Sequence, residues 1–283
     1  MPSVAVLLPV HNEQWLIGSV LGQVTDFART HPDWRFIFVD DGSSDGTPTR
    51  IREHLEEIGD ASIELRALVP NQCKARALRT VVLETEEDLV LFTDGDLAYN
   101  LDHLDELVKA LEAADVAIGS RALSQGPQTN ITTTRRLVGT TFNRIVRLIT
   151  GLHHQDTQAG LKGFQRDAAR VLFRAQVVED FAFDAELLYL AKVLDLKVRE
   201  IPANVSARHS YKKSRVNMLR DPLRMFGSLI KMRIAHRKLR NRSPRSAPIA
   251  ARKDPPEIDI EPDLERVIED KSPRPAETAH TER

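Results

Sequence analysis

The chain has 283 residues, of which 41% are hydrophobic and 29% charged, and its 40 Lys and Arg against 41 Asp and Glu give a formal charge of −1. This near-neutral globular composition argues against a generally basic nucleic-acid binder, so no nucleic-acid partner is expected. The single cysteine excludes a disulfide framework and a cysteine-rich zinc site, and it favours a reducing compartment. The first residues lack the features of a signal peptide, and no apolar run reaches the roughly 18 residues that span a bilayer. We therefore expect a soluble or peripheral cytoplasmic protein.

Short apolar runs alternate with segments of helical period through the first 120 residues. Strands are predicted at 4–8, 36–39, 63–69, 89–93 and 116–119, and helices at 13–27, 45–55, 74–83 and 101–111. Strands this apolar, separated by helices, indicate a mostly parallel sheet that helices cover on both faces. The predicted fold class is therefore α/β.

The pattern is less regular after residue 120. Residues 124–134 are polar and rich in turn formers, which predicts a mobile loop. Helices are predicted at 136–148 and 182–194, and one more strand at 198–201. Residues 222–239 combine apolar residues at helical spacing with Lys and Arg, which predicts a basic amphipathic helix. From residue 241 the chain is Pro-rich and charged, and this predicts a disordered tail.

Charge is distributed unevenly along the chain. Residues 1–207 hold 21 basic and 30 acidic side chains, residues 208–245 hold 13 and one, and residues 254–283 hold 4 and 10. The basic 208–245 segment lacks the interleaved aromatic residues of a single-strand nucleic-acid binder. Its mixture of basic and apolar residues is typical of a helix on an anionic membrane surface, and an ordinary solvated helix is the alternative.

Polar clusters follow four of the predicted strands directly, at residues 9–13, 40–45, 71–74 and 94–96. Ligands of open α/β sheets bind beyond the carboxyl ends of the strands, so these clusters are expected to line one edge of the sheet. A single acidic turn could be a helix cap, as for Asp45. Four clusters at the same edge predict a binding site.

The segment Asp94-Gly95-Asp96 is the sharpest of these clusters. Residues i and i+2 at a strand end project to the same side, so the two carboxylates can hold one divalent cation. Mg²⁺ and Mn²⁺ prefer such oxygen ligands and commonly bridge carboxylates to substrate phosphates. Gly95 would leave room for a close ligand. An acidic turn before the next helix is the alternative.

In their order and spacing, five segments resemble the inverting family 2 glycosyltransferases of the GT-A fold: PVHNE, VDDGSSD, TDGD, GSR and DTQAGLKGF. The resemblance covers residues 3–235, and the later FAFDAELL, EIP and SRV elements are similar to the polyprenyl-phosphate (dolichyl-phosphate) hexose synthases, whose glucosyl branch is nearest. It implies transfer of a hexose from a nucleotide sugar to a polyprenyl phosphate, with Mg²⁺ or Mn²⁺ as cofactor. UDP-glucose is the first choice of donor and GDP-mannose the second.

The resemblance also implies roles for individual residues. For the nucleotide sugar these are Pro9, His11, Glu13, Asp41, Lys74, Asp94, Gln158 and Arg215. The implied metal ligands are Asp94 and Asp96, and the implied catalytic group is Asp94, Asp96, Arg121 and Arg136, whose arginines take the acceptor phosphate. Asp156, Gln158 and Lys162 match a segment near the sugar.

Two departures from the family pattern stand out. The glycine-rich Asn-x-Gly-Lys-Gly segment of the family reads Asn71-Gln72-Cys73-Lys74-Ala75, so both glycines are replaced. Arg215 stands where the family usually has lysine, and the two residues are not equivalent at a phosphate.

The implied reaction makes physical sense with these residue types. A lipid phosphate is already an anionic nucleophile, so it needs no strong general base. It needs positioning, arginines such as Arg121 and Arg136 that can bind a phosphate in a bidentate way, and a metal that stabilises the leaving diphosphate. In-line displacement would invert the anomeric carbon. For Asp184 and Glu186 a functional or supporting role and a purely structural role both stay open.

Other enzyme classes fit poorly, because the G-x-G-x-x-G of a dehydrogenase and the P-loop of an NTPase are absent. A non-catalytic nucleotide-sugar-binding or scaffold protein, or a family 2 enzyme with another acceptor, stays possible. We expect a GT-A domain over residues 1–240, divided into a nucleotide-sugar half (1–120), an acceptor half (121–215) and the basic helix (216–240), before the 241–283 tail. The expected location is the inner face of the membrane, and the oligomeric state is left open.

Overall fold

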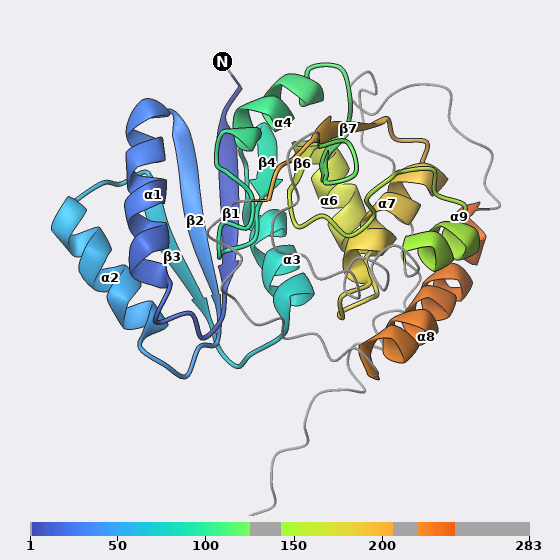
Figure 1. Ribbon diagram of the computed structural model, residues 1–283, viewed down its shortest axis with the longest axis horizontal. Helices are drawn as coiled ribbons and strands as arrows, with labels where there is room; N and C mark the ends of the chain where they lie inside the picture. The colour runs from blue at the N-terminus through green and yellow to red at the C-terminus, as the bar shows by residue number, and fades with distance from the viewer. Residues whose placement is uncertain (1, 125–142, 206–219, 241–283) are drawn as a thin grey trace, which may run out of the picture.

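The computed structural model describes residues 2–124, 143–205 and 220–240, and Figure 1 shows how its elements are arranged. A seven-stranded sheet lies at the centre, in the order β3-β2-β1-β4-β6-β5-β7. Within the described ranges β6 alone runs antiparallel to its neighbours. The strands are β1 (Val4–Val10), β2 (Trp34–Asp41), β3 (Ile63–Leu68), β4 (Leu89–Phe92), β5 (Val116–Ser120), β6 (Lys162–Gln165) and β7 (Val198–Pro202). The mostly parallel α/β sheet is confirmed.

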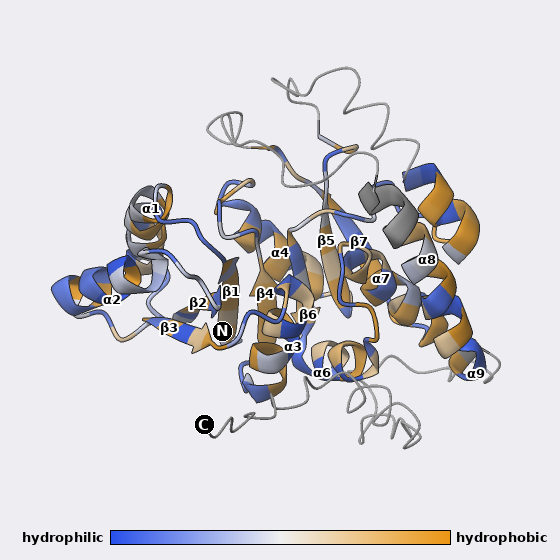
Figure 2. Cartoon of the chain, turned by 90° about the horizontal axis from the view of Figure 1, so that it is seen from below, coloured by the Kyte–Doolittle hydropathy of each residue, from blue (hydrophilic) through white to orange (hydrophobic). Residues whose placement is uncertain are grey.

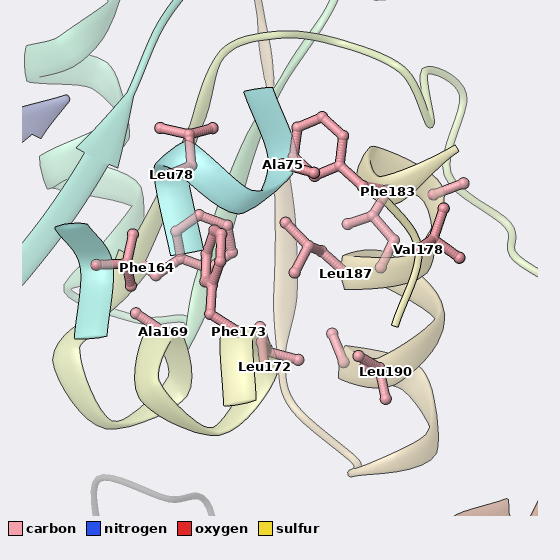
Figure 3. Packing of buried hydrophobic residues seen from close by; sticks show 14 of the residues in the cluster. Ala75, Leu78, Phe164, Ala169, Leu172, Phe173, Val178, Phe183, Leu187 and Leu190 are labelled. Atoms are coloured by element: carbon pink, nitrogen blue, oxygen red, sulfur yellow. The ribbon is translucent and has the colours of Figure 1, made fainter. Parts of the chain in front are cut away.

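Helices cover both faces of this sheet. One face packs against α1 (Ile17–Thr30), α2 (Thr47–Ile58) and α4 (His103–Leu111), and the other against α3 (Lys74–Glu84), α6 (Arg166–Ala175) and α7 (Phe183–Val193). Figure 3 shows the second of these cores, where Leu78, Phe164, Phe173 and Leu187 come from four different elements. Because both faces are covered, β1 and β4 in the middle of the sheet consist almost entirely of hydrophobic residues, and β4 is accordingly orange in Figure 2.

The basic C-terminal helix of the prediction is present as α8 (Arg220–Ala235) and the short α9 (Arg237–Arg240). The break falls at His236, whose ring is buried and lies 2.8 Å from the Glu186 carboxylate on α7. Glu186 is fully buried and also accepts hydrogen bonds from the backbone N–H groups of Val177 and Val178. Glu186 therefore holds α8 against the body of the protein, which gives it a structural role.

Sequence reasoning missed β6 and α6. β6 reads KGFQ, and four residues that include Lys, Gly and Gln carry no strand pattern of their own. Its conformation comes from pairing with β4 and β5 on either side. The helix predicted at 13–27 begins later, at Ile17, because residues 13–16 form a turn in which the Glu13 carbonyl accepts hydrogen bonds from the backbone N–H groups of Leu16 and Ile17.

Several predictions fall on residues outside the described ranges. They are most of the loop at 124–134, the start of the helix predicted at 136–148, residues 208–219 of the basic segment, and the tail from 241 onward. The described part of that helix, residues 143–150, is helical.

Candidate active site

The predicted polar clusters meet at the carboxyl end of the parallel strands, and hydrogen bonds join them in sequence. The backbone N–H of Asn12, after β1, donates to the Ser43 hydroxyl after β2 at 2.8 Å. The N–H of Gln72, after β3, donates to Asp41 at 2.7 Å. Lys74, which begins α3, donates to Asp94 after β4. The expectation that these clusters share one edge is confirmed.

Asp41 and His11 lie on the β1–β2 side of this edge. Asp41 is buried and also accepts a hydrogen bond from the Asn71 side chain, whose Nδ2 lies 3.2 Å from Nδ1 of His11. Burial raises the pKa of Asp41, and hydrogen bonds and the nearby His11 oppose that effect. The backbone N–H of Glu13 donates a hydrogen bond to the Thr47 hydroxyl, which ties the turn before α1 to the start of α2.

Cys73, which replaces a family glycine, keeps a backbone conformation that glycine prefers. Its φ is +73° and its ψ is 153°, a region in which a Cβ atom is strained. Its thiol is half-buried, and burial raises the pKa of that thiol, so the protonated form is favoured. Cys73 therefore holds a backbone conformation that glycine would adopt without this strain.

Replacing Cys73 with glycine is expected to stabilise the protein by about 1 kcal/mol, because relief of strain exceeds the entropy that glycine adds to the unfolded chain. Chemical denaturation measures this difference. Cys73→Ala is the control, since it removes the thiol and keeps the Cβ, and it should give no gain. Equal stability of the glycine and alanine variants would contradict the strain.

Asp94 and Lys74 form an ion pair at the centre of the site. Oδ1 of Asp94 lies 2.5 Å from Nζ of Lys74, and both side chains are about one-third exposed. Burial opposes ionisation of Asp94, but Lys74, Lys162 and Arg121 outweigh it and hold the pKa of the carboxyl below its usual value. The Lys74 ammonium also lies 5.6 Å from the ring centres of Phe92 and Phe183.

Asp96 completes the acidic pair after β4. One of its oxygens accepts the backbone N–H of Ala98 at 3.2 Å, and its charge contributes to raising the pKa of Lys74. In the described part of the chain no group of three or more His, Cys, Asp or Glu side chains could hold a metal by itself. Two carboxylates with the remaining ligands from substrate phosphates and water are the usual set for Mg²⁺, so the residues present fit such an ion.

Gly95, between these two carboxylates, was predicted to leave room for a ligand, and the structure does not bear this out. A Cβ at Gly95 would lie 2.2 Å from the backbone oxygen of Pro9 and 2.7 Å from Val10. The space at Gly95 is therefore filled by β1 and is not left for a ligand. Pro9, which was predicted to contact the nucleotide, is placed by this packing directly beside the acidic segment.

Arg121 follows β5 and is held by Asp156. Its Nε and Nη2 atoms donate to the two carboxylate oxygens at 2.6 and 2.9 Å, and its backbone N–H donates to the same group. Burial opposes ionisation of Asp156, and Arg121 outweighs it, so the pKa of Asp156 is lowered. Asp156 is buried while the Arg121 side chain is 40% exposed. The carboxylate therefore fixes the direction of a guanidinium that still reaches the surface of the site.

The segment before β6 supplies the remaining residues. The backbone N–H of Gln158 donates to Asp156, and its buried Nε2 has no hydrogen-bond partner within the described residues. Lys162 is fully buried and donates to Asp184 of α7 at 2.5 Å. Gly160, a member of the DTQAGLKGF segment for which the sequence predicted no individual role, packs against Asp94. Arg136 and Arg215 lie outside the described residues, so their predicted roles stay predictions.

One known protein family and several known proteins match this chain in sequence. Residues 5–173 match the family described as glycosyl transferase family 2. The dolichyl-phosphate beta-glucosyltransferase of Drosophila melanogaster is 32% identical over 211 residues, which cover 70% of this chain and 65% of the relative. A dolichyl-phosphate beta-glucosyltransferase of Trichomonas vaginalis is 31% identical, and the match covers 69% of this chain and 61% of the relative. The human dolichyl-phosphate beta-glucosyltransferase is 28% identical, and the match covers 71% of this chain and 66% of the relative. The chain thus spans less than two thirds of each of these relatives.

Solved structures give the fold. Glucosyl-3-phosphoglycerate synthase from Mycobacterium tuberculosis in complex with uridine diphosphate superposes with a TM-score of 0.57 at 19% identity, covering 84% of this chain and 80% of that one. The same enzyme with Mn²⁺, UDP-glucose and phosphoglyceric acid gives 0.54 at 18% identity, with 83% and 79% covered. These neighbours have the GT-A fold, which confirms the predicted architecture.

Proposed function

Because the chain belongs to glycosyl transferase family 2, we propose that it is a hexosyltransferase that moves glucose from UDP-glucose to the phosphate of a polyprenyl or dolichyl lipid. The observation that carries the proposal is the juxtaposition of two arrangements at one edge of the sheet. One is the acidic pair Asp94 and Asp96 beside Lys74, and the other is Arg121 held by Asp156. The names of the relatives favour glucose over mannose, with GDP-mannose as the second donor.

In this proposal the donor lies across the ends of β1, β2 and β4. His11, Glu13 and Asp41 surround the nucleoside, while Lys74 and Asp94 lie beside the diphosphate with Gln158 near the sugar. A bound Mg²⁺ or Mn²⁺ at Asp94 and Asp96 would stabilise negative charge on that diphosphate. Arg215, which is not among the described residues, would add a further cation to the same group.

The acceptor phosphate lies against Arg121, with Arg136 as its second ligand. Its oxygen attacks the anomeric carbon while the bond from that carbon to the diphosphate breaks, and the electron pair leaves with the nucleotide. Attack from the face opposite the leaving group inverts the anomeric carbon. No side chain has to remove a proton, because the phosphate is already ionised, so the protein contributes position and charge.

Transfer of radiolabelled sugar to purified polyprenyl phosphate tests the proposal. UDP-glucose and GDP-mannose are run side by side with Mg²⁺ or Mn²⁺, and the chloroform-soluble product is counted. We expect labelled lipid with UDP-glucose at a higher rate than with GDP-mannose. Absence of labelled lipid with both donors would rule out the proposed reaction. It would favour a non-catalytic protein or a family 2 enzyme with another acceptor.

We also propose that the enzyme meets its lipid at the cytoplasmic membrane surface through the 208–245 segment. No helix among the described residues is long and apolar enough to cross a bilayer. The outer side of α8 exposes Phe226, Ile230 and Ile234 at helical spacing, and Lys231 lies among them. Apolar side chains flanked by lysine and arginine suit an anionic lipid surface.

Replacing Ile230 and Ile234 together with glutamine is expected to weaken binding to phosphatidylserine-containing vesicles about tenfold, because two inserted side chains lose their apolar contact. Vesicle sedimentation measures the bound fraction. Val69→Gln removes another exposed apolar side chain, at the opposite edge of the sheet, and should bind as the wild type does. Unchanged sedimentation of the double variant would contradict the assignment of this surface.

A further inference from the structure

The Asp94 carboxylate is confined from two sides. Nζ of Lys74 lies 2.5 Å from Oδ1 on one side. On the other side the backbone of Gly160 is so close that a Cβ there would lie 2.0 Å from Oδ2 and 2.4 Å from Cγ. The φ of Gly160 is not in the left-handed region, so contact with Asp94 is what excludes a side chain at this position. The place of the carboxylate therefore depends on the place of the peptide at Gly160.

A buried ion pair holds that peptide. The Lys162 ammonium donates to the carbonyl oxygen of Ala159, the group bonded directly to the nitrogen of Gly160. The same ammonium donates to Asp184 of α7 at 2.5 Å and lies 5.6 Å from the ring centre of Phe92, two residues before Asp94. Lys162 is therefore attached at once to α7, to β4 and to the 159–160 peptide.

A contribution to the stability of the fold does not by itself explain why the Lys162–Asp184 ion pair is buried here. The Lys162 side chain is fully buried and that of Asp184 is 9% exposed, so both have left most of their hydration. Apolar residues of similar volume commonly replace such pairs without loss of stability, because desolvation cancels much of the attraction. What an apolar pair cannot do is donate a hydrogen bond to the Ala159 carbonyl.

We propose that Lys162 and Asp184 are positioning residues that fix the Asp94 carboxylate through the Ala159–Gly160 peptide. This inference rests on the proposed function in one respect, namely that Asp94 serves a divalent metal and the donor diphosphate. In the absence of the ammonium the peptide is free to shift, and the carboxylate against it loses its fixed place beside Lys74. Neither residue needs to touch the substrate.

The double variant Lys162→Met/Asp184→Leu tests the proposal, since it replaces both charges and leaves neither partner buried alone. We expect thermal unfolding within a few degrees of the wild type. Binding of Mn²⁺ in the presence of UDP or GDP, followed by the electron paramagnetic resonance of free Mn²⁺, should weaken roughly 10- to 100-fold, as is usual when the support of a ligand is lost. The kcat for transfer should fall by a similar factor, with little change in KM for the lipid phosphate.

A matched control lies on the same two strands at their other end. Arg166, directly after β6, donates to Asp88, directly before β4, at 2.6 Å. Asp88→Asn/Arg166→Met removes this exposed ion pair and should keep Mn²⁺ binding and kcat at wild-type values. Gly160→Ala is the second test variant, because it moves the Asp94 carboxylate with no change of charge, and it should reproduce the loss of Mn²⁺ affinity.

The outcomes separate this proposal from the proposed function. Wild-type Mn²⁺ affinity in a folded double variant, or in Gly160→Ala, would overturn the positioning role. Wild-type protein that binds no Mn²⁺ with either nucleotide would overturn the metal site and this inference with it. Mn²⁺ binding that depends on Lys162 in a protein that transfers no sugar would support the positioning role and overturn the proposed reaction.

Discussion

Asp96→Asn is expected to reduce sugar transfer by roughly 10³-fold or more, which corresponds to about 4 kcal/mol of lost transition-state stabilisation. The reason is that a leaving diphosphate gains negative charge, and in the proposed site one carboxylate cannot hold the metal that balances this charge. Asparagine keeps an oxygen that can accept the Ala98 N–H, so the turn after β4 should persist. Transfer of radiolabelled glucose measures the loss, and Mn²⁺ binding should fall with it.

Asp102→Asn is the matched control for this variant. Asp102 is exposed, lies six residues further along and makes no side-chain hydrogen bond to the start of α4. The Asp102→Asn variant should transfer sugar at the wild-type rate. An Asp96→Asn protein with undiminished activity would remove the metal assignment altogether.

Arg121→Lys is expected to lower kcat/KM for the polyprenyl phosphate about 100-fold or more, because lysine keeps the charge but cannot form two parallel hydrogen bonds with a carboxylate. Asp156 would then lose the paired hydrogen bonds from the guanidinium while it remains buried, and the cation would lose its fixed direction. Binding of the nucleotide should change much less, since the donor contacts are assigned to other strands. Steady-state kinetics with the lipid varied at saturating donor separates the two effects.

A double-mutant cycle tests whether Asp156 acts through Arg121. If Asp156 acts through Arg121, then Asp156→Asn should cost about 10- to 100-fold alone and little in the Arg121→Lys background. Arg166→Lys is the control, because its ion pair with Asp88 is exposed and lies at the far end of the strands. Strictly additive losses at positions 121 and 156 would show that the two side chains act independently.

The sequence was sufficient to predict the edge on which the site lies. Apolar runs mark the parallel strands, and whatever follows such strands must gather at one edge, so Asp41, Lys74 and Asp94 could be placed together without a structure. The contacts between them could not. Arg121 and Asp156 are 35 residues apart, and their pairing arises only because the segment before β6 returns beside the end of β5.

Glycine positions were the least predictable part of the site. Gly95 indicated room for a ligand, but the backbone of Pro9 occupies that room. Gly160 belongs to the DTQAGLKGF segment that carries the family resemblance, but its contact with Asp94 could not be predicted, because that contact depends on a strand whose own sequence does not predict a strand. At Cys73 the sequence had lost its glycine while the backbone kept the glycine conformation. For both glycines the decisive neighbour is distant in the sequence.

The position of β6 between β4 and β5 has a consequence for the order in which the parts of the protein fold. Leu89 of β4 pairs with Gln165 of β6, so the strand that carries the acidic pair stays an open edge on that side until some 75 further residues have been synthesised. Closing so long a loop is slow compared with forming the local units that precede it. The nascent chain can thus assemble β1 to β4 early, yet the Asp94 carboxylate gains its support only when β6 enters the sheet. Completion of the site is in this way tied to completion of the fold.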